Sequence, residues 1–253
     1  MSVNAIEAFK DNYIWAIIDE SRHTAICVDP GAAEPVLQFI NKNQLNLTAI
    51  LVTHHHFDHC GGLEKLQKTF PHVEIFTPDD SRIPLSTIAL HDEDIIHLGE
   101  YDFRVMAIPG HTRTHIAFYE PSKKWLFCGD TLFSAGCGRV FDGTLEDLYH
   151  SLQLIKNLPD ETSIYCGHEY TRKNLQFAAQ VEPNNQAIRD YLNYLQKHGD
   201  LCSLPSRLAL EKQINPFLRT DSLHLKSFAQ QENLDPDNSL AIFQRLREKK
   251  DNF

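Results

Sequence analysis

The segment His54-His55-His56-Phe57-Asp58-His59 constrains this chain more than any other part of its sequence. It follows the apolar run 48–53, which predicts a short buried strand, and it precedes Gly61-Gly62. Side chains alternate along a strand, so His54 and His56 are expected on one side, and a turn then lets Asp58 and His59 point to a second nearby position. Imidazole and carboxylate groups are ligands for zinc and similar metals. Four candidate ligands are more than one open catalytic zinc needs, and the spacing therefore predicts two metals.

Three further candidate ligands each follow an apolar run and are each directly preceded by a glycine: His111, Asp130 and His168. A glycine lets the backbone turn tightly and approach a site closely. Other readings remain open at this point, since the first segment could be a polar turn with solvated histidines, Asp130 a helix cap, and the two histidines core residues. Seven candidates at the ends of several strands favour a metal site.

The chain divides by its pattern of elements near residue 170. Before it, strand and helix signals alternate, and we predict an α/β catalytic domain over residues 1–170. Its expected strands are 13–18, 24–28, 48–53, 73–77, 103–108, 125–128 and 164–166; its expected helices are 34–42, 62–70 and one capped by Thr144. After it, strand signals disappear, and we predict a small all-helical domain over residues 171–253 with helical segments at about 171–181, 184–198, 206–214 and 238–251.

Composition excludes several classes of protein. The net charge of -10 argues against a general nucleic-acid binder, and the apolar runs are far shorter than the roughly 20 residues of a membrane span. The first residues carry no pattern of a secretion signal, and six cysteines without such a signal are expected to be reduced thiols. We therefore expect a soluble, cytoplasmic protein with no membrane or nucleic-acid partner, and a monomer. No G-x-S-x-G motif supports a serine hydrolase, and no phosphate-binding G-x-x-x-x-G-K-[ST] loop is present.

The chain resembles the metallo-β-lactamase superfamily and, within it, the hydroxyacylglutathione hydrolases (glyoxalase II). The superfamily likeness rests on HHHFDH, PGHT, FCGDT and CGHE in the right order. The closer likeness covers nearly the whole chain and rests on DNY-x-W at 11–15, DPG at 29–31, GDTLF-x-AGCGR at 129–139, GHEYT at 167–171, NPF at 215–217 and REKKD at 247–251. It implies an αββα sandwich, which is two sheets between helices, followed by the helical domain.

The resemblance also implies the roles of the candidate ligands. His54, His56 and His111 would hold one divalent metal, Asp58, His59 and His168 the other, and Asp130 would bridge them. Zinc is the first expectation and iron or manganese the alternatives. Asp58 and Asp130 would serve catalysis together with a metal-bound hydroxide. His55 is expected to be structural, and His115 to support or pack against the site. Thr114 departs from the glycine that is common in the family.

For the substrate, the resemblance implies a glutathione thioester. The residues that would bind its glutathione part are Arg139, Phe141, Tyr170, Arg247 and Lys250. Phe141 stands where some members have tyrosine and so lacks one hydroxyl donor. The implied reaction is metal-dependent hydrolysis of S-D-lactoylglutathione to glutathione and D-lactate, the second step of methylglyoxal detoxification. The alternatives are another thioester, lactone or β-lactam hydrolase, a persulfide dioxygenase with one iron, a metal-dependent nuclease, and a non-catalytic module stabilised by metal.

Overall fold

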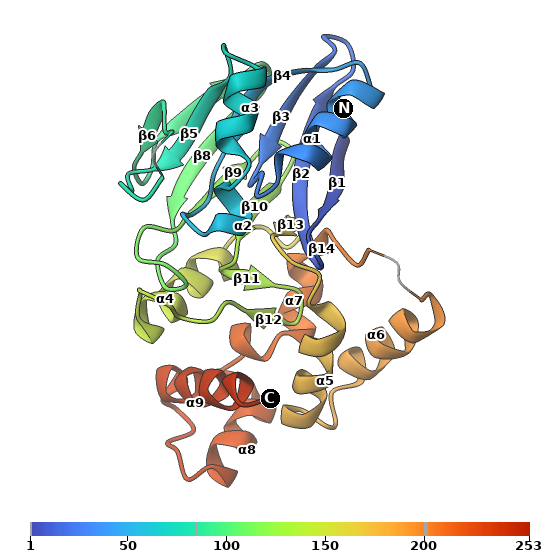
Figure 1. The fold of residues 1–253 in the computed structure, drawn as a ribbon. Helices are drawn as coiled ribbons and strands as arrows, with labels where there is room; N and C mark the ends of the chain where they lie inside the picture. Colours follow the sequence, from blue (N-terminus) through green and yellow to red (C-terminus); the bar gives the residue numbers. More distant parts are fainter. Residues whose placement is uncertain (1, 84, 200–201) are drawn as a thin grey trace. The chain divides into compact units, whose positions relative to one another are not determined.

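A computed structural model describes residues 2–83, 85–199 and 202–253, and these form two compact units (Figure 1). The first unit comprises Met1–Ala107 and Thr114–Gly129, and the second comprises Ile108–Arg113 and Asp130–Phe253. Each unit is described by itself below. The division of the chain at residue 170 remains a proposal about its domain organisation.

A six-stranded mixed sheet forms one layer of the first unit. Its strands lie in chain order: β1 (Ser2–Ala8), β2 (Asn12–Asp19), β3 (Thr24–Val28), β4 (Asn46–Leu51), β5 (Glu74–Pro78) and β6 (Ile88–Leu90). Strands β1 to β3 are antiparallel, and β3 to β6 are parallel. Parallel neighbours need a crossover connection, which α1 (Ala33–Lys42) supplies between β3 and β4, and α2 (Phe57–Cys60) with α3 (Leu63–Thr69) between β4 and β5.

A second set of strands in the same unit is an antiparallel meander. It comprises β7 (Ile95–Leu98), β8 (Tyr101–Ala107), β9 (Ile116–Glu120) and β10 (Trp125–Gly129). Strand β2 is buried along its whole length, because α1 and α3 cover one face of the first sheet and the meander lies against the other (Figure 1). Ile14 and Ala16 of β2 belong to one apolar core with Val36 and Ile40 of α1. This layered core holds the loop after β4, where the histidine segment begins.

The second unit begins its regular structure with a short hairpin of β11 (Leu132–Phe133) and β12 (Gly136–Cys137). Helix α4 (Leu145–Lys156) follows, and the hydroxyl of Thr144 accepts a hydrogen bond from the Asp147 amide at 3.0 Å, which confirms the predicted cap. Strand β13 (Ser163–Cys166) pairs with the two-residue strand β14 (Ser206–Arg207). The helices that follow are α5 (Thr171–Val181), α6 (Gln186–Lys197), α7 (Leu208–Ile214), the 3-10 helix η1 (Pro216–Leu218), α8 (Leu223–Gln231) and α9 (Ser239–Asp251).

The predicted helical character is confirmed for the described residues of 171–253, where β14 is the exception. This strand lies where the sequence predicts the start of a helix, and α7 begins only at Leu208. The sequence analysis does not predict helices α2, η1 and α8 or strands β1, β6, β7, β9, β11 and β12. Among the helices of the described residues, none combines the length and the apolar character that a membrane span requires.

Candidate metal centre and substrate pocket

His54 and His56 present two ring nitrogens to the same position in the first unit. Nε2 of His54 lies 3.1 Å from Nδ1 of His56. Two nitrogen ligands at about 2.0–2.1 Å from a tetrahedral zinc would lie roughly 3.3 Å apart, so this separation fits two ligands of one metal. The two side chains therefore lie on one side, as predicted, although β4 ends at Leu51 and both histidines belong to the loop after it.

A buried carboxylate that the sequence reasoning does not single out, Asp29, organises these ligands. Asp29 accepts hydrogen bonds from the amide and the hydroxyl of Thr53, both at 2.7 Å, and its Oδ2 lies 3.0 Å from Nδ1 of His59. A carboxylate only accepts, so the hydrogen of the last contact is on Nδ1 of His59. The Thr53 hydroxyl is already used as a donor and accepts in turn from Nδ1 of His54 at 3.0 Å. Both histidines are thus held with Nε2 as the metal-binding nitrogen.

Asp29 itself has a left-handed backbone, with φ of 53°, at the turn that the Asp29-Pro30-Gly31 motif forms. One oxygen of Asp29 lies within 4.8 Å of one ring nitrogen each of His54 and His59, as in a metal-ligand group. Its hydrogen bonds to Thr53 and His59 make it a residue that orients ligands. The DPG motif at 29–31 draws attention to Asp29, although the sequence alone identifies this motif only as a turn.

Asp58 and His59 present the second pair of donors in this unit. Nε2 of His59 lies 3.8 Å from Oδ2 of Asp58, and that oxygen accepts a hydrogen bond from the Asn12 side chain at 3.0 Å. The backbone of Asp58 lies directly against Gly31. Only glycine fits there, because a Cβ atom at position 31 would lie 1.9 Å from the carbonyl oxygen of Asp58. Asn12 of the DNY motif and Gly31 of the DPG motif therefore both contact Asp58 and help to position it.

His55 points to a different set of partners from its two neighbours. Its Nδ1 lies 3.7 Å from Oδ2 of Asp80, which also binds Arg82 at 2.6 Å and accepts a hydrogen bond from Thr114 at 2.5 Å. Thr114, the departure from the family pattern, is thus an anchor of this carboxylate. The pKa of Asp80 lies well below its usual value, because hydrogen bonds from Arg82 and Thr114 outweigh the effect of burial, which alone would raise it.

The ring of His115 stacks on His54, with centroids 4.6 Å apart and an interplanar angle of 18°. Its Nδ1 lies 3.0 Å from the carbonyl oxygen of Ile116, and the side chain is buried. His115 therefore packs against a predicted ligand, as one of its two expected roles requires.

In the second unit, one oxygen of Asp130 lies between two imidazoles. Oδ2 of Asp130 is 3.6 Å from Nε2 of His111 and 3.3 Å from Nε2 of His168. Nδ1 of His111 lies 2.6 Å from the carbonyl oxygen of Arg139, an acceptor, so His111 also presents Nε2. The turn before His111 requires glycine, because Gly110 has a φ of 141°. All three side chains are buried.

The donor chemistry of both units suits divalent first-row metals. The first unit contributes three imidazoles and a carboxylate, and the second contributes two imidazoles and a carboxylate. These are the neutral nitrogen and anionic oxygen donors that zinc, iron and manganese accept, with no thiolate among the predicted ligands. The described residues therefore fit the predicted divalent metals.

A cavity of about 310 Å³ in the second unit contains most of the predicted substrate residues. Its lining comprises Phe133, Cys137, Arg139, Tyr170, Lys173, Asn174, Arg247, Lys250 and Asp251, and we call it the cationic pocket. Four of the five predicted residues lie in it. The fifth, Phe141, is not among the residues that line it; its exposed ring instead stands edge-on to His111, with centroids 5.2 Å apart. Lys173 is a lining residue that sequence reasoning misses.

The charges of the cationic pocket are unevenly paired. Asp251 binds Arg247 at 3.0 Å and Arg139 at 3.1 Å, so one carboxylate serves two guanidinium groups. Burial, and then the charges of Arg247 and Lys173, lower the pKa of Lys250 to about 8. Burial also raises the pKa of the Cys137 thiol to about 11, although Arg247 beside it acts in the opposite direction.

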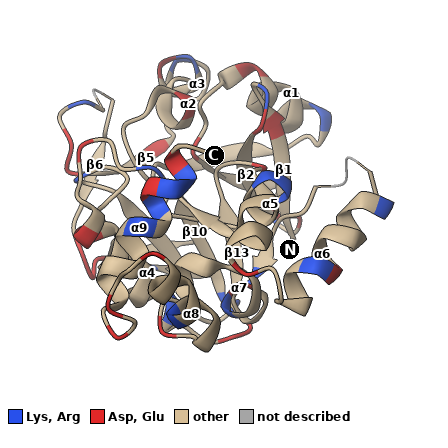
Figure 2. Ribbon diagram, turned by 90° about the horizontal axis from the view of Figure 1, so that it is seen from below, with Lys and Arg blue, Asp and Glu red and all other residues tan. Residues whose placement is uncertain are grey.

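Ring packing connects the cationic pocket to a predicted ligand within the same unit. Tyr170 stacks on His168 with centroids 4.7 Å apart and an interplanar angle of 6°, and Phe133 stands edge-on to both rings. A substrate in this pocket therefore lies beside residues that contact the proposed metal centre. Figure 2 shows the Lys and Arg positions on α5 and α9, which supply three of the four cations.

The fully buried Glu211 fixes the loop between β11 and β12. Its carboxylate accepts from the Ser134 hydroxyl at 2.8 Å, the Ala135 amide at 2.7 Å and the Asn215 amide group at 3.1 Å, and also from Ser206. Asn215 additionally donates to the carbonyl oxygens of Phe133 and Gly136. Burial raises the pKa of Glu211, and these donors oppose the rise. Asn215 of the NPF motif thus positions the β11–β12 hairpin, whose residues Phe133 and Cys137 line the cationic pocket.

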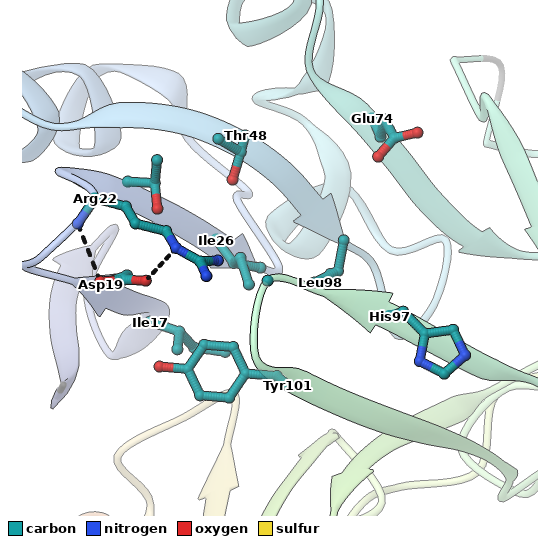
Figure 3. Close-up of a pocket in the computed structure, with 11 residues that line it drawn as sticks. Ile17, Asp19, Arg22, Ile26, Thr48, Glu74, His97, Leu98 and Tyr101 are labelled. Atoms are coloured by element: carbon teal, nitrogen blue, oxygen red, sulfur yellow. Dashed lines mark hydrogen bonds and ion pairs between the residues drawn. The ribbon is translucent and has the colours of Figure 1, made fainter.

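A different cavity, of about 280 Å³, lies in the first unit (Figure 3). It is lined at the starting ends of β3 and β5 by Thr24 and Glu74, whereas the histidine segment follows the opposite end of β4. Its polar groups are partly paired with one another, since Nε of Arg22 lies 3.6 Å from Oδ2 of Asp19. This cavity contains none of the predicted site residues.

Comparisons with known proteins agree with the geometry. Residues 13–168 match the family model of the metallo-beta-lactamase superfamily, and residues 169–253 match that of the hydroxyacylglutathione hydrolase C-terminus. The first match makes the fold that of the metallo-β-lactamases, a class of metal-dependent enzymes, and confirms the predicted α/β fold class with its helical C-terminal part. The chain belongs to the hydroxyacylglutathione hydrolase family within that superfamily.

Individual relatives support both the family and the fold. A hydroxyacylglutathione hydrolase of Legionella pneumophila (strain Corby) is 48% identical over 253 residues, covering 100% of both chains. The crystal structure of ETHE1 from Myxococcus xanthus has a TM-score of 0.68 and 25% identity, covering 99% of this chain and 100% of that one. TTHA1623 in a di-iron-bound form has a TM-score of 0.60 and 24% identity, covering 82% of this chain and 95% of that one.

Proposed function

We propose that this chain hydrolyses the thioester bond of S-(2-hydroxyacyl)glutathione, with S-D-lactoylglutathione as the first substrate, to release glutathione and a 2-hydroxy acid. The observation that carries the proposal is the cationic pocket, because Arg139, Tyr170, Arg247 and Lys250 line one cavity. A ligand with carboxylates fits a pocket whose cations outnumber its anions. The names of the full-length relatives support the same substrate.

The proposed metal centre has seven protein ligands. His54, His56 and His111 would hold one ion, Asp58, His59 and His168 the other, and Asp130 would bridge them. Zinc is the first candidate, and the di-iron form of a protein with a related fold keeps iron as an alternative. When bound, the metals would supply an activated water and polarise the thioester carbonyl.

The protein's own residues prepare this chemistry. Asp29 contacts His59 directly and His54 through Thr53, which fixes Nε2 of both histidines as ligand atoms, and the Asn12 side chain donates to Oδ2 of Asp58. Asp58 and Asp130 are the carboxylates proposed to take part in the reaction, where Oδ atoms can accept the proton of the attacking water. The leaving glutathione is a thiolate with an ordinary pKa of about 8.5, so it can depart without a separate acid.

The test is turnover by the metal-loaded protein with four substrates. Zinc, iron and manganese forms are assayed with S-D-lactoylglutathione, a β-lactam, a lactone and glutathione persulfide, with thiol release, ring opening and oxygen uptake measured separately. We expect thiol release from lactoylglutathione at the highest kcat/KM. Oxygen uptake with the persulfide in the iron form, or preference for a β-lactam or lactone, would overturn the proposal in favour of those activities.

For the setting of the reaction, we propose a cytoplasmic monomer. The support is the composition, with a net charge of -10 and six cysteines that form no disulfide among the described residues. Light scattering of the purified protein tests the monomer, and fractionation of cells that express the full chain tests the compartment.

A further inference from the structure

Lys173 lies on α5 and faces the cationic pocket, yet no family motif assigns it a role. Within residues 2–83, 85–199 and 202–253, no carboxylate forms an ion pair with Lys173 or Lys250. The one carboxylate of the lining, Asp251, is taken by Arg139 and Arg247. The pocket therefore has two arginines that are already paired and two lysines that are not.

The two lysines also oppose each other. The charge of Lys173 is one of the causes that lower the pKa of Lys250, after burial and Arg247. Lys250 is additionally placed against aromatic rings, with Nζ 5.5 Å from the centroid of Phe177 and 5.0 Å from that of Phe253. Asp251 acts in the opposite direction on Lys250 but is not in ion-pair contact with it. Two like charges near each other with no carboxylate in direct contact cost free energy, and an anionic ligand removes that cost.

We propose that Lys173 is a further substrate-binding residue that receives one of the two carboxylates of the glutathione part, and that it makes the pocket select thioesters with two carboxylates over those with one. This inference rests on the proposed function for its substrate. Lys250 receives the other carboxylate, and the two Asp251-bound arginines line the same cavity. The number of unpaired cations thus equals the number of glutathione carboxylates.

Its location distinguishes Lys173 from nearby cations that do not line the cationic pocket. Arg172, next to Lys173, donates to the carbonyl oxygen of Leu195 at 2.7 Å and does not line the pocket. Lys197, in the last turn of α6, is exposed and also lies outside the lining. Lys197 is therefore a matched control, since its neutralisation changes the net charge of the protein by the same amount.

The experiment compares Lys173→Gln and Lys197→Gln in the full metal-loaded enzyme. We expect Lys173→Gln to raise KM for S-D-lactoylglutathione roughly five- to tenfold with a smaller change in kcat, because a charge-assisted contact is worth about 1 kcal/mol. Lys197→Gln should leave KM unchanged. Thermal unfolding checks that both variants stay folded, as expected for exposed helix positions.

A second panel removes charges from the substrate. The wild type is assayed with lactoyl thioesters of γ-glutamylcysteine, which lacks the glycyl carboxylate, and of glutathione ethyl ester, in which that carboxylate is masked. We expect a higher KM for both, and the difference from lactoylglutathione should shrink in Lys173→Gln if Lys173 receives the glycyl carboxylate. An undiminished difference in Lys173→Gln with an unchanged KM for lactoylglutathione would overturn the inference.

A binding measurement without turnover tests the role of Lys173 independently of the proposed hydrolysis. Calorimetry with S-methylglutathione, a thioether that cannot be hydrolysed, should show the same five- to tenfold weakening in Lys173→Gln. Loss of this dependence in an enzyme that turns over lactoylglutathione would contradict the inference alone. Retention of it in a protein that cleaves no glutathione thioester would contradict the proposed function alone.

Discussion

Oδ2 of Asp29 lies 3.0 Å from Nδ1 of His59, and the same oxygen accepts from the hydroxyl of Thr53, which itself contacts His54. One carboxylate thus sets the orientation of two predicted ligands. We predict that Asp29→Asn lowers metal affinity 10- to 100-fold, because an amide can donate to the wrong partner and no longer favours the required tautomers. Chelator competition on the metal-free protein measures the change.

The matched control for this change is Asp102→Asn. Asp102 also contacts a histidine, with Oδ1 2.7 Å from Nδ1 of His97, but both side chains are exposed and belong to strands β7 and β8. It should leave the metal affinity as it is. Equal losses in the two variants would mean that charge alone, and not the orientation of His54 and His59, explains the effect.

Asp130→Asn is predicted to lower both metal content and rate. Wild-type protein should bind close to two metals per chain, as the proposed ligand set requires. Because Oδ2 of Asp130 lies near Nε2 of both His111 and His168, loss of its charge should loosen both ions. Elemental analysis with titration of the second metal gives the content. A variant with wild-type content and kcat would refute the bridging role.

The low pKa of Asp80 predicts a specific response to acid. A carboxylate whose pKa is lower in the folded than in the unfolded state stabilises the fold above its ordinary pKa of 3.8 and loses this effect as the pH falls below it. The difference in unfolding free energy between the wild type and Asp80→Asn should thus be constant from pH 7 to about 5 and shrink below about 4. Urea unfolding of the metal-free proteins at several pH values measures it, and a constant difference down to pH 3 would contradict the assignment.

Glu211→Ala should destabilise the second unit strongly. The change leaves buried donors of Ser134, Ala135 and Asn215 without their acceptor, and each such loss costs on the order of 1 kcal/mol or more. A total of about 3 kcal/mol would lower Tm by roughly 6–12 °C in a protein of this size. Glu146→Ala, at an exposed position of α4, is the control and should shift Tm by less than about 2 °C.

Substrate binding should weaken above pH 8 because of Lys250. Its pKa of about 8 means that the ammonium group loses its proton as the pH rises through that value, and a neutral amine no longer attracts a carboxylate. KM for lactoylglutathione should therefore be flat below about pH 7 and rise above pH 8, after correction for spontaneous thioester hydrolysis. In Lys250→Arg the guanidinium stays charged, so KM should remain flat to pH 9.5. The same rise in both proteins would assign it to another group.

The sequence predicts candidate metal ligands because metal ligation demands particular residue types at particular positions. The apolar strands before the candidate ligands are continuous enough to be recognised, although β4 ends at Leu51 and the loop after it, not the strand itself, brings His54 and His56 together. The DPG motif is read only as a chain break, because nothing local shows that Asp29 will meet His59, thirty residues later.

Other features escape for different physical reasons. Residues 2–8, which form β1, mix polar and apolar side chains because much of the strand is only partly buried. Helix α8 begins with an exposed leucine, Leu223, so its apolar residues do not show a clear helical periodicity in the sequence. Lys173 is one exposed lysine among many in the sequence, and only the folded chain shows that it shares a cavity with Lys250.

Cys137 gives the cationic pocket a chemical property of its own. A thiolate in contact with a thioester can take over the acyl group by exchange, and the enzyme would then modify itself instead of releasing an acid. With its pKa raised to about 11, only on the order of one molecule in ten thousand carries the Cys137 thiolate at pH 7. The burial that packs this side chain against Arg247 thus keeps a sulfur atom of the proposed substrate pocket unreactive, so that water would remain the acceptor of the acyl group.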